Sequence, residues 1–223
     1  MIPGLILAVI LGLVAIVFWQ RYRRLARDRF IRDYVLPKGL YERLRKRRPE
    51  LEMKDCMLVA RGLRKFFLAY LHSGRQFVAM PSQVVDDLWH EFILYTKAYD
   101  DFCKHAFGQF LHHTPAVVLG PDKRDNEGLR RVWWHACKEE NIDPAKPLRL
   151  PLLFALDAKL GIADGFVYTP DCKSLRSDAG GNVHCGTDFS DSSVDGGTDG
   201  FGDSDGGGDG GGDGGGGCGG GGD

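Results

Sequence analysis

Apolar residues at helical spacing between residues 85 and 106 constrain the fold more than any other feature of this sequence. They recur at steps of three and four, so they occupy one side of a helix with about 3.6 residues per turn. Ser82 before the stripe is a residue type that caps helix N-termini, and Gly108 after it is typical of a helix end. We therefore expect one long amphipathic helix. Its apolar positions are Val85, Leu88, Trp89, Phe92, Tyr95, Thr96, Tyr99, Phe102, Cys103 and Ala106.

Three further segments carry helix signals. A second apolar stripe covers residues 56–70 and ends near Ser73, where a glycine follows. A third helix is expected from about residue 125 to residue 141. A fourth is expected over residues 151–160, with a proline in its first turn and a glycine as its C-cap. A short extended piece is expected at residues 166–168, and the predicted fold class is all-α, as a small helical bundle or array.

The composition changes along the chain and predicts four parts. Residues 2–19 contain no charged side chain and are almost wholly apolar, which at roughly 27 Å of helix predicts a transmembrane helix. Residues 20–49 form a basic juxtamembrane segment, and residues 50–176 form the helical domain. Residues 177–223 are dominated by glycine, aspartate and serine. That last part has too few apolar side chains to offset the entropy of ordering, so a flexible acidic tail is expected.

Arginines directly after the apolar run predict its orientation. Basic residues favour the cytoplasmic side of a membrane, so we expect a single-pass protein of the inner membrane with its N-terminus outside and its domain in the cytoplasm. Membrane lipid is the expected partner of this segment, and a nucleic acid is not, because aromatic stacking residues are not interleaved with the charges. Cysteines in a reducing cytosol are expected as free thiols. The expected contacts to lipid headgroups are Arg21, Arg23, Arg24 and Arg27.

His90 lies outside the apolar stripe and is a candidate for chemistry. Asp86 precedes it by one helical turn, and such a pair can fix the imidazole tautomer or bind one metal ion. His112 and His113 follow the expected helix end, and a sharp return of the chain would carry one of them back to His90. A solvated or structural role is the favoured interpretation of His90. The alternatives are acid-base chemistry and a divalent metal such as zinc, for which these four residues are the candidate ligands. Cys103 is assigned to the core, and no catalytic residue is assigned.

A motif within residues 81–115 resembles the glycine-rich domain-containing protein-like family. The matching residues are Val85, Asp86, Trp89, His90, Tyr99, Cys103 and a histidine at 112 or 113. The pattern of that family has a second histidine where this chain has Phe92, which weakens a metal site carried over from the family. The resemblance implies a bacterial membrane protein of unassigned function with a glycine-rich tail, and it implies no established reaction.

Three functions are compatible with these features. The sequence favours a non-enzymatic interaction or scaffolding module that presents its helical domain to a protein partner from the membrane. The second is a metal-binding domain or metal-dependent enzyme that uses Asp86, His90 and either His112 or His113. The third is a lipid- or ligand-binding domain with an aromatic groove between its helices.

Overall fold

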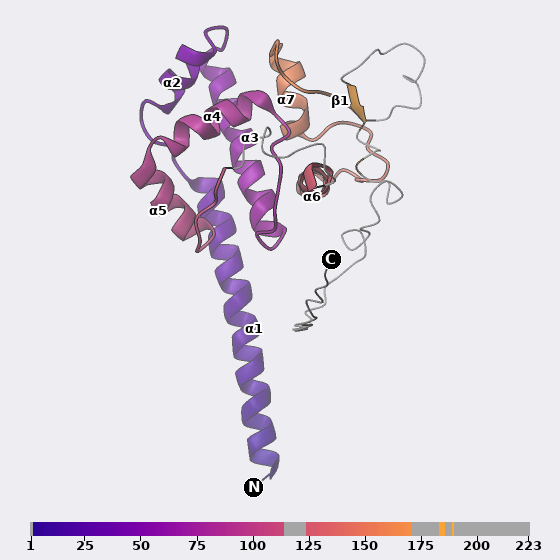
Figure 1. Cartoon of the computed structure of the whole chain (residues 1–223). Coiled ribbons are helices and arrows are strands. Elements are labelled where there is room, and N and C mark those ends of the chain that lie inside the picture. The colour runs from indigo at the N-terminus through magenta and orange to yellow at the C-terminus, as the bar shows by residue number, and fades with distance from the viewer. Residues whose placement is uncertain (1, 114–123, 171–182, 186–188, 190–223) are drawn as a thin grey trace, which may run out of the picture. The chain divides into compact units, whose positions relative to one another are not determined.

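The computed structural model of the chain describes residues 2–113, 124–170, 183–185 and 189, with the side chains of 2–5, 8, 124–126 and 183–185 left aside. The fold is all-α, as predicted, and the described residues form seven helices and one pair of short strands (Figure 1). The helices are α1 (Ile2–Asp33), α2 (Leu40–Arg47), α3 (Met53–His72), α4 (Gln83–Ile93), α5 (Thr96–Ala106), α6 (Arg124–Glu139) and α7 (Leu152–Leu160). The strands are β1 (Val167–Thr169) and β2 (Val183–Cys185), which pair in parallel.

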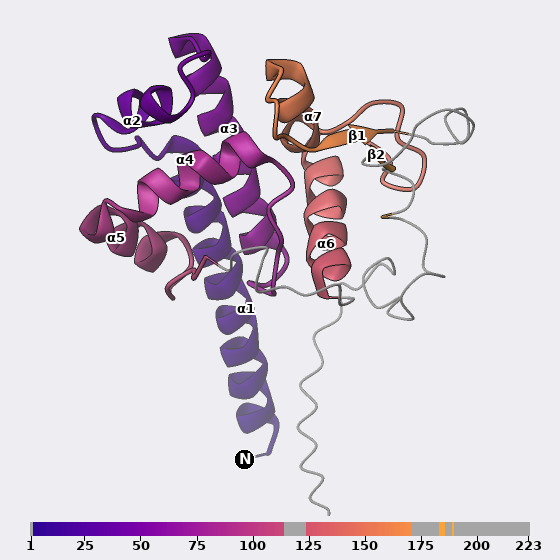
Figure 2. The same cartoon turned by 45° about the horizontal axis from the view of Figure 1, so that its top comes forward.

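Helix α3 is the centre of the core. Helices α1, α2, α4, α6 and α7 all contact it, and Figure 2 shows α4 running across α3 with α7 to one side. Gly62 lies in α3 where these neighbours approach, and a Cβ atom there would overlap with Leu156 and press on Val85 at 3.0 Å. The missing side chain therefore allows α7 and α4 to pack directly on the α3 backbone.

The basic segment expected over residues 20–49 contributes to the core. Ile31 in α1 and Leu40 and Leu44 in α2 are at most 1% exposed. The sequence prediction followed the high arginine content and gave no weight to these apolar residues between the charges. The structure instead places the end of α1 against α3 and α5, and α2 against α3 and α4.

The first part of α1 extends away from the other helices (Figure 1). Across the residues that the structure describes, no helix has an apolar stretch of the length needed to cross a membrane. The transmembrane helix expected over residues 2–19 is thus not confirmed. Helix α1 runs without a break through Arg21, Arg23 and Arg24 to Asp33, and its second half packs on the core.

The long helix expected over residues 85–106 is in fact two helices, α4 and α5, joined by a turn at Leu94 and Tyr95. At Tyr95 the backbone leaves the helical region, with φ −84° and ψ 59°, and the Leu94 side chain is 61% exposed. Both helices bury their apolar side in the same core, so the spacing continues through the turn and gave no sign of a break. Ser82 caps α4 as predicted, with its Oγ accepting a hydrogen bond from the Val85 amide.

The remaining elements follow the sequence prediction closely. Helices α3, α6 and α7 lie where expected, and Gly161 ends α7 with φ +63°. Strand β1 overlaps the expected extended piece. Phe189 is 7% exposed and packs on Trp133 and Phe154, so the folded body reaches into residues 177–223, which the sequence assigned to a flexible tail. The other residues of that tail, apart from β2, lie outside the described residues.

Cys56, Cys103 and Cys137 are buried free thiols in the core. Burial raises the pKa of each thiol, that of Cys137 to about 12, so these side chains are uncharged at neutral pH and suit apolar packing. Cys172, Cys218 and the side chain of Cys185 are not among the described residues, and the expectation of free thiols there stays a prediction.

Candidate metal centre

Asp86, His90 and His113 come together beside α4. The His113 Nε2 atom lies 2.9 Å from Asp86 Oδ1, and the His90 Nδ1 atom lies 3.3 Å from Asp86 Oδ2. The two imidazole ring centroids are 4.2 Å apart. One ligand atom from each of the three residues lies within 4.8 Å of the other two. Donors at 2.1 Å from a tetrahedral ion are about 3.4 Å apart, so a small movement of these side chains would let them share one ion.

His90 has an unpaired nitrogen in this cluster. Its Nδ1 atom is buried and has no hydrogen-bond partner, although 40% of the side-chain surface is exposed. A buried polar atom without a partner costs about 1 to 3 kcal/mol. The Nδ1 atom lies 3.3 Å from Asp86 Oδ2 without a hydrogen bond, and a cation between them would satisfy both groups.

Of the two neighbouring histidines predicted as ligands, His113 joins the cluster and His112 does not. The His112 side chain is exposed, and its ring lies against Phe110 with centroids 4.8 Å apart. The sequence prediction left the choice between them open, because the direction of each side chain depends on how the chain returns from α5. Cys103 is fully buried in the core, as predicted.

A chain of hydrogen bonds fixes the segment that carries His113. The Trp89 Nε1 atom donates to the Tyr99 hydroxyl at 3.1 Å, and that hydroxyl donates to the Leu111 carbonyl at 2.6 Å. Tyr99 is 1% exposed, and this burial raises the pKa of its hydroxyl, so the hydroxyl remains a proton donor at neutral pH. Leu111 lies two positions before His113. The edge of the Trp89 ring also contacts the His113 ring, with centroids 4.6 Å apart.

The spacing of the resembled motif also reflects hydrogen bonds that sequence reasoning missed. Val85, Trp89, Tyr99 and Cys103 were assigned to core packing, and all four are buried. Two of them, Trp89 and Tyr99, also form the hydrogen bonds that hold the site. The one available signal was the occurrence of Trp and Tyr in the same short motif as the candidate ligands.

Asp157 fixes the beginning of α4 and was also missed. This carboxylate is 2% exposed and lies in the apolar helix α7. It accepts hydrogen bonds from Ser82 Oγ at 2.7 Å, Gln83 N at 2.7 Å, Val84 N at 3.1 Å and Phe166 N at 2.9 Å. The first turn of α4, which contains Asp86, is thereby tied to α7 and to the segment before β1.

The acid next to Asp86 has a separate role. Asp87 is fully buried and forms ion pairs with Arg47 Nε at 2.9 Å and Arg48 Nε at 2.7 Å. Arg48 also pairs with Asp164, and these contacts hold α2 on α4. Asp87 is thus a structural residue and takes no part in the cluster of Asp86, His90 and His113.

The four arginines predicted to contact lipid headgroups lie along α1. Arg21, Arg23 and Arg24 are exposed. Arg27 is partly buried, and its guanidinium covers Gly108, which has φ +75°. Burial lowers the pKa of Arg27. Three of the four are therefore free to meet a charged surface, whereas Arg27 packs on the end of α5.

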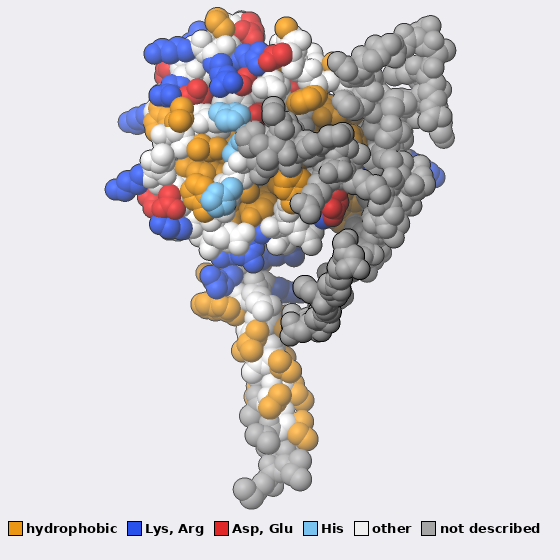
Figure 3. All heavy atoms as spheres, viewed as in Figure 1, with side chains coloured by type: hydrophobic (Ala, Val, Ile, Leu, Met, Phe, Trp, Pro, Cys, Tyr) orange, Lys and Arg blue, Asp and Glu red, His pale blue; other side chains and the backbone are white. Residues whose placement is uncertain are grey.

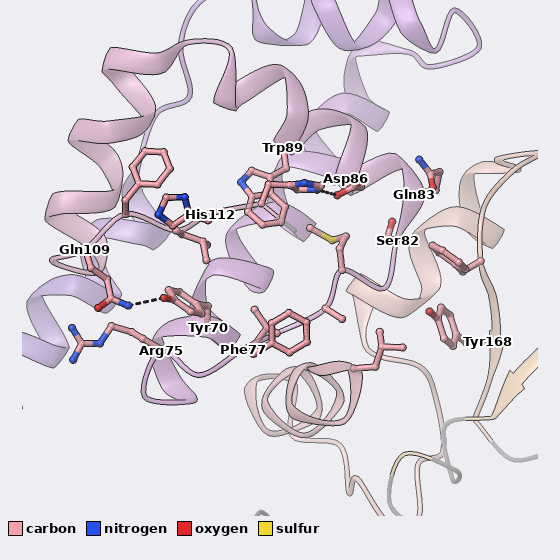
Figure 4. A pocket seen from close by; sticks show the side chains of 18 residues that line it. Tyr70, Arg75, Phe77, Ser82, Gln83, Asp86, Trp89, Gln109, His112 and Tyr168 are labelled. Carbon is pink, nitrogen blue, oxygen red and sulfur yellow. Dashed lines mark hydrogen bonds and ion pairs between the residues drawn. The ribbon is translucent and has the colours of Figure 1, made fainter. Parts of the chain in front are cut away.

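A cavity of about 500 Å³ opens beside the cluster. Asp86, Trp89 and His113 belong to its lining, and Figure 4 shows Asp86 and Trp89 at one end with Tyr70, Arg75 and Gln109 at the other. On the molecular surface, histidine side chains on this face are bordered by hydrophobic ones (Figure 3). The cluster thus lies at the edge of an apolar cavity and not on a polar surface.

These observations define an all-α protein in which two histidines and an aspartate meet at the edge of a cavity. The model of the UCP032817-like family matches residues 26–189, and the chain belongs to that family. A search of the curated proteins and a search of the solved structures each found no match. The matched range contains the cluster and the residues that support it. The resemblance to the glycine-rich domain-containing protein-like family is not tested by these findings and stays a prediction.

Proposed function

We propose that this protein binds one divalent transition-metal ion through Asp86, His90 and His113. The observation that carries the proposal is the convergence of three ligand atoms within 4.8 Å, two from α4 and one from the segment after α5. Two imidazoles and one carboxylate are a donor set that suits zinc or iron(II). Three protein ligands leave a coordination position for water or for an oxygen of a ligand, as in metal sites that carry out chemistry.

A hydrogen-bonded cluster without a metal explains this arrangement less well. The pair formed by His113 and Asp86 at 2.9 Å is satisfied by one proton between them. That pair leaves the buried Nδ1 atom of His90 without a partner. A metal ion accounts for the positions of all three side chains together.

Zinc titration of the full-length chain tests the proposal. Competition with a chromophoric chelator is expected to give one equivalent of bound zinc, and His90→Ala is expected to lower the affinity about 100-fold or more. His105→Ala is the matched control, because the exposed His105 ring contacts the Asp101 carbonyl at 2.7 Å, away from the cluster. The control should bind zinc as the wild type does. Equal zinc binding by the His90→Ala protein would contradict the proposal.

We also propose that the first part of α1 attaches the protein to membrane lipid. The apolar side chains of this part are between 50% and 74% exposed and surround the helix. Large exposed apolar surfaces on soluble proteins are rare and mark contacts with partners or membranes. Trp19 and Tyr22 suit the membrane interface, and Arg21, Arg23 and Arg24 suit anionic headgroups. The exposed residues are Ile6, Leu7, Val9, Ile10, Leu11, Leu13, Val14, Ile16, Val17, Phe18, Trp19 and Tyr22.

This second proposal concerns attachment to lipid, and the protein partner expected from the sequence stays a prediction. Flotation of the full-length chain with vesicles that contain anionic lipid tests it. The wild type should float, and the double variant Leu13→Asp, Ile16→Asp should stay in the aqueous fraction. Leu148→Asp is the control, since Leu148 is 97% exposed elsewhere on the protein. A double variant that floats as the wild type does would argue against lipid attachment through this surface.

A further inference from the structure

The cavity beside the metal cluster has one polar end whose groups are partly hydrogen-bonded within the protein. Gln109 Nε2 donates to the Tyr70 hydroxyl at 2.8 Å, and an Arg75 guanidinium nitrogen donates to the Phe107 carbonyl at 3.0 Å. These groups lie opposite Asp86 in Figure 4. Arg75 keeps its positive charge and further N–H groups, so a carboxylate held at this end would bind with or without zinc, and the zinc dependence measured below separates the two ends.

The other end of the cavity contains the cluster. Asp86 and His113 line it directly, and Trp89 lies beside them. A divalent cation held by one carboxylate and two neutral imidazoles leaves a net charge of about +1 in an apolar surrounding. A single negative charge on a ligand would neutralise this site, and the cation would stabilise that charge in the apolar surrounding.

The walls between the two ends are mainly apolar and partly aromatic. Phe77, Phe110 and Phe166 line the cavity and remain 36–40% exposed. Met80 and Leu129 add aliphatic surface to the same cavity. Partly exposed aromatic side chains around an opening are typical of binding sites for organic ligands, and a volume of about 500 Å³ is ordinary for one small molecule.

From this placement we infer that the cavity is the ligand chamber of the metal centre and that it binds a small organic monocarboxylate with an apolar body. The carboxylate of the ligand occupies the open position of the metal ion held by Asp86, His90 and His113. The apolar body lies against Phe77 and Phe166. This inference rests on the proposed metal site and adds to it the chemical class of the ligand.

Binding of 2-naphthoate and of its neutral analogue 2-naphthalenemethanol to the full-length chain tests the inference. Each probe is titrated against the zinc-loaded protein and the metal-free protein, and binding is followed by probe fluorescence. We expect 2-naphthoate to bind the zinc-loaded protein about 10-fold or more tightly than the metal-free protein. The neutral analogue should bind both forms with equal, weaker affinity, because it contacts the apolar walls alone.

Two cavity variants and one control separate the apolar contacts from the metal. Phe166→Ala and Phe77→Leu should each weaken 2-naphthoate binding severalfold while zinc affinity, measured separately, stays at the wild-type value. Leu148→Ala, at a side chain that is 97% exposed outside the cavity, should change neither quantity. Retained zinc affinity shows that each variant is folded at the site.

The outcomes distinguish the two proposals. If the wild type binds no zinc, the metal function fails and the ligand inference fails with it. If zinc binds through the three residues but 2-naphthoate binds equally with and without it, the ligand inference alone is overturned. Unchanged 2-naphthoate binding by both cavity variants would also overturn it, since the probe would then occupy another place.

Discussion

His113 Nε2 lies 2.9 Å from Asp86 Oδ1, although 27 positions separate the two residues in the chain. The turn at Leu94 and Tyr95 makes this contact possible. The chain leaves α4, changes direction into α5 and returns along residues 107–113 to the exposed side of α4. A single straight helix over the same residues would have carried His113 far from Asp86. The candidate metal centre is thus a product of the break between α4 and α5.

The hydroxyl of Tyr99 should matter for both stability and metal affinity. Tyr99→Phe leaves the buried Trp89 N–H and Leu111 carbonyl without their partner, so we expect a loss of about 2 to 4 kcal/mol in the free energy of unfolding. Zinc affinity should fall about 10-fold, because the segment that carries His113 loosens. Tyr95→Phe is the control, since that hydroxyl makes a 3.3 Å contact to the Lys38 carbonyl on the surface. Urea unfolding and zinc titration measure both effects, and equal behaviour of the two variants would refute this role.

Removal of the negative charge from Asp157 should destabilise the protein strongly. Asp157→Asn replaces one carboxylate oxygen by an amide N–H₂ group, which then faces other hydrogen-bond donors. We expect the free energy of unfolding to fall by about 3 kcal/mol. Asp164→Asn is a matched control, since its side chain is 59% exposed and the loss of its ion pair with Arg48 should cost at most about 1 kcal/mol. Chemical denaturation of both variants checks the difference. A cost for Asp157→Asn no larger than for the control would show that the cap is dispensable.

Gly62 should resist replacement by alanine although alanine favours helices. The Cβ atom of Gly62→Ala would overlap with Leu156 in α7. We expect the free energy of unfolding to fall by about 1 to 3 kcal/mol, whereas glycine-to-alanine changes inside helices usually raise it by up to about 1 kcal/mol. Gly12→Ala in α1 is the comparison, because no atom lies within 4 Å of the added group. It should cause no loss. Thermal unfolding of the two variants measures this, and a stabilised Gly62→Ala protein would disagree with the packing described.

Stability should fall as the pH drops from about 6.5 to 4, in part because of His135. Burial, followed by the positive charges of His72, Arg24 and Arg131, lowers the pKa of His135 from 6.5 to about 4. The unfolded chain therefore takes up a proton at this residue before the folded chain does as the pH falls. The corresponding loss of stability is complete below the folded pKa and amounts to at most about 3 kcal/mol.

His135→Gln isolates this contribution. The variant should lose less stability than the wild type between pH 7 and pH 4.5, as measured by urea unfolding at each pH. Lowered carboxyl pKa values, such as that of Glu139 beside Arg32, act in the same direction at still lower pH and are present in both proteins. An unchanged slope in His135→Gln would show that this residue is protonated in the folded state.

The sequence was sufficient to predict α3, α6 and α7 and one half of the candidate site. Periodic apolar positions gave α3, α6 and α7, and the spacing of Asp86 and His90 on one helix indicated a pair of ligands. These features depend on neighbours within one helical turn, where spacing determines geometry. The caps at Ser82 and Gly161 were also predicted from the sequence, since they depend on local backbone conformation.

Features that depend on how distant segments pack could not be predicted from the sequence. The apolar stripe continues across the turn at Leu94 and Tyr95, so its periodicity concealed the break. The choice of His113 over His112 follows from the hydrogen bond between Tyr99 and Leu111, which joins α5 to the returning segment. The burial of Phe189 depends on contacts with Trp133 and Phe154, and the glycine-rich composition around it gave no indication of this.

Zinc stoichiometry of the neighbouring variants His112→Ala and His113→Ala tests the central claim most directly. The two substitutions remove the same group at adjacent positions, so unspecific effects on the segment are matched. Full-length protein of each variant is equilibrated with zinc, freed of excess metal and measured by elemental analysis. We predict one zinc ion per chain in His112→Ala and a loss of nearly all zinc in His113→Ala. Equal zinc content in the two variants would contradict the metal centre of Asp86, His90 and His113.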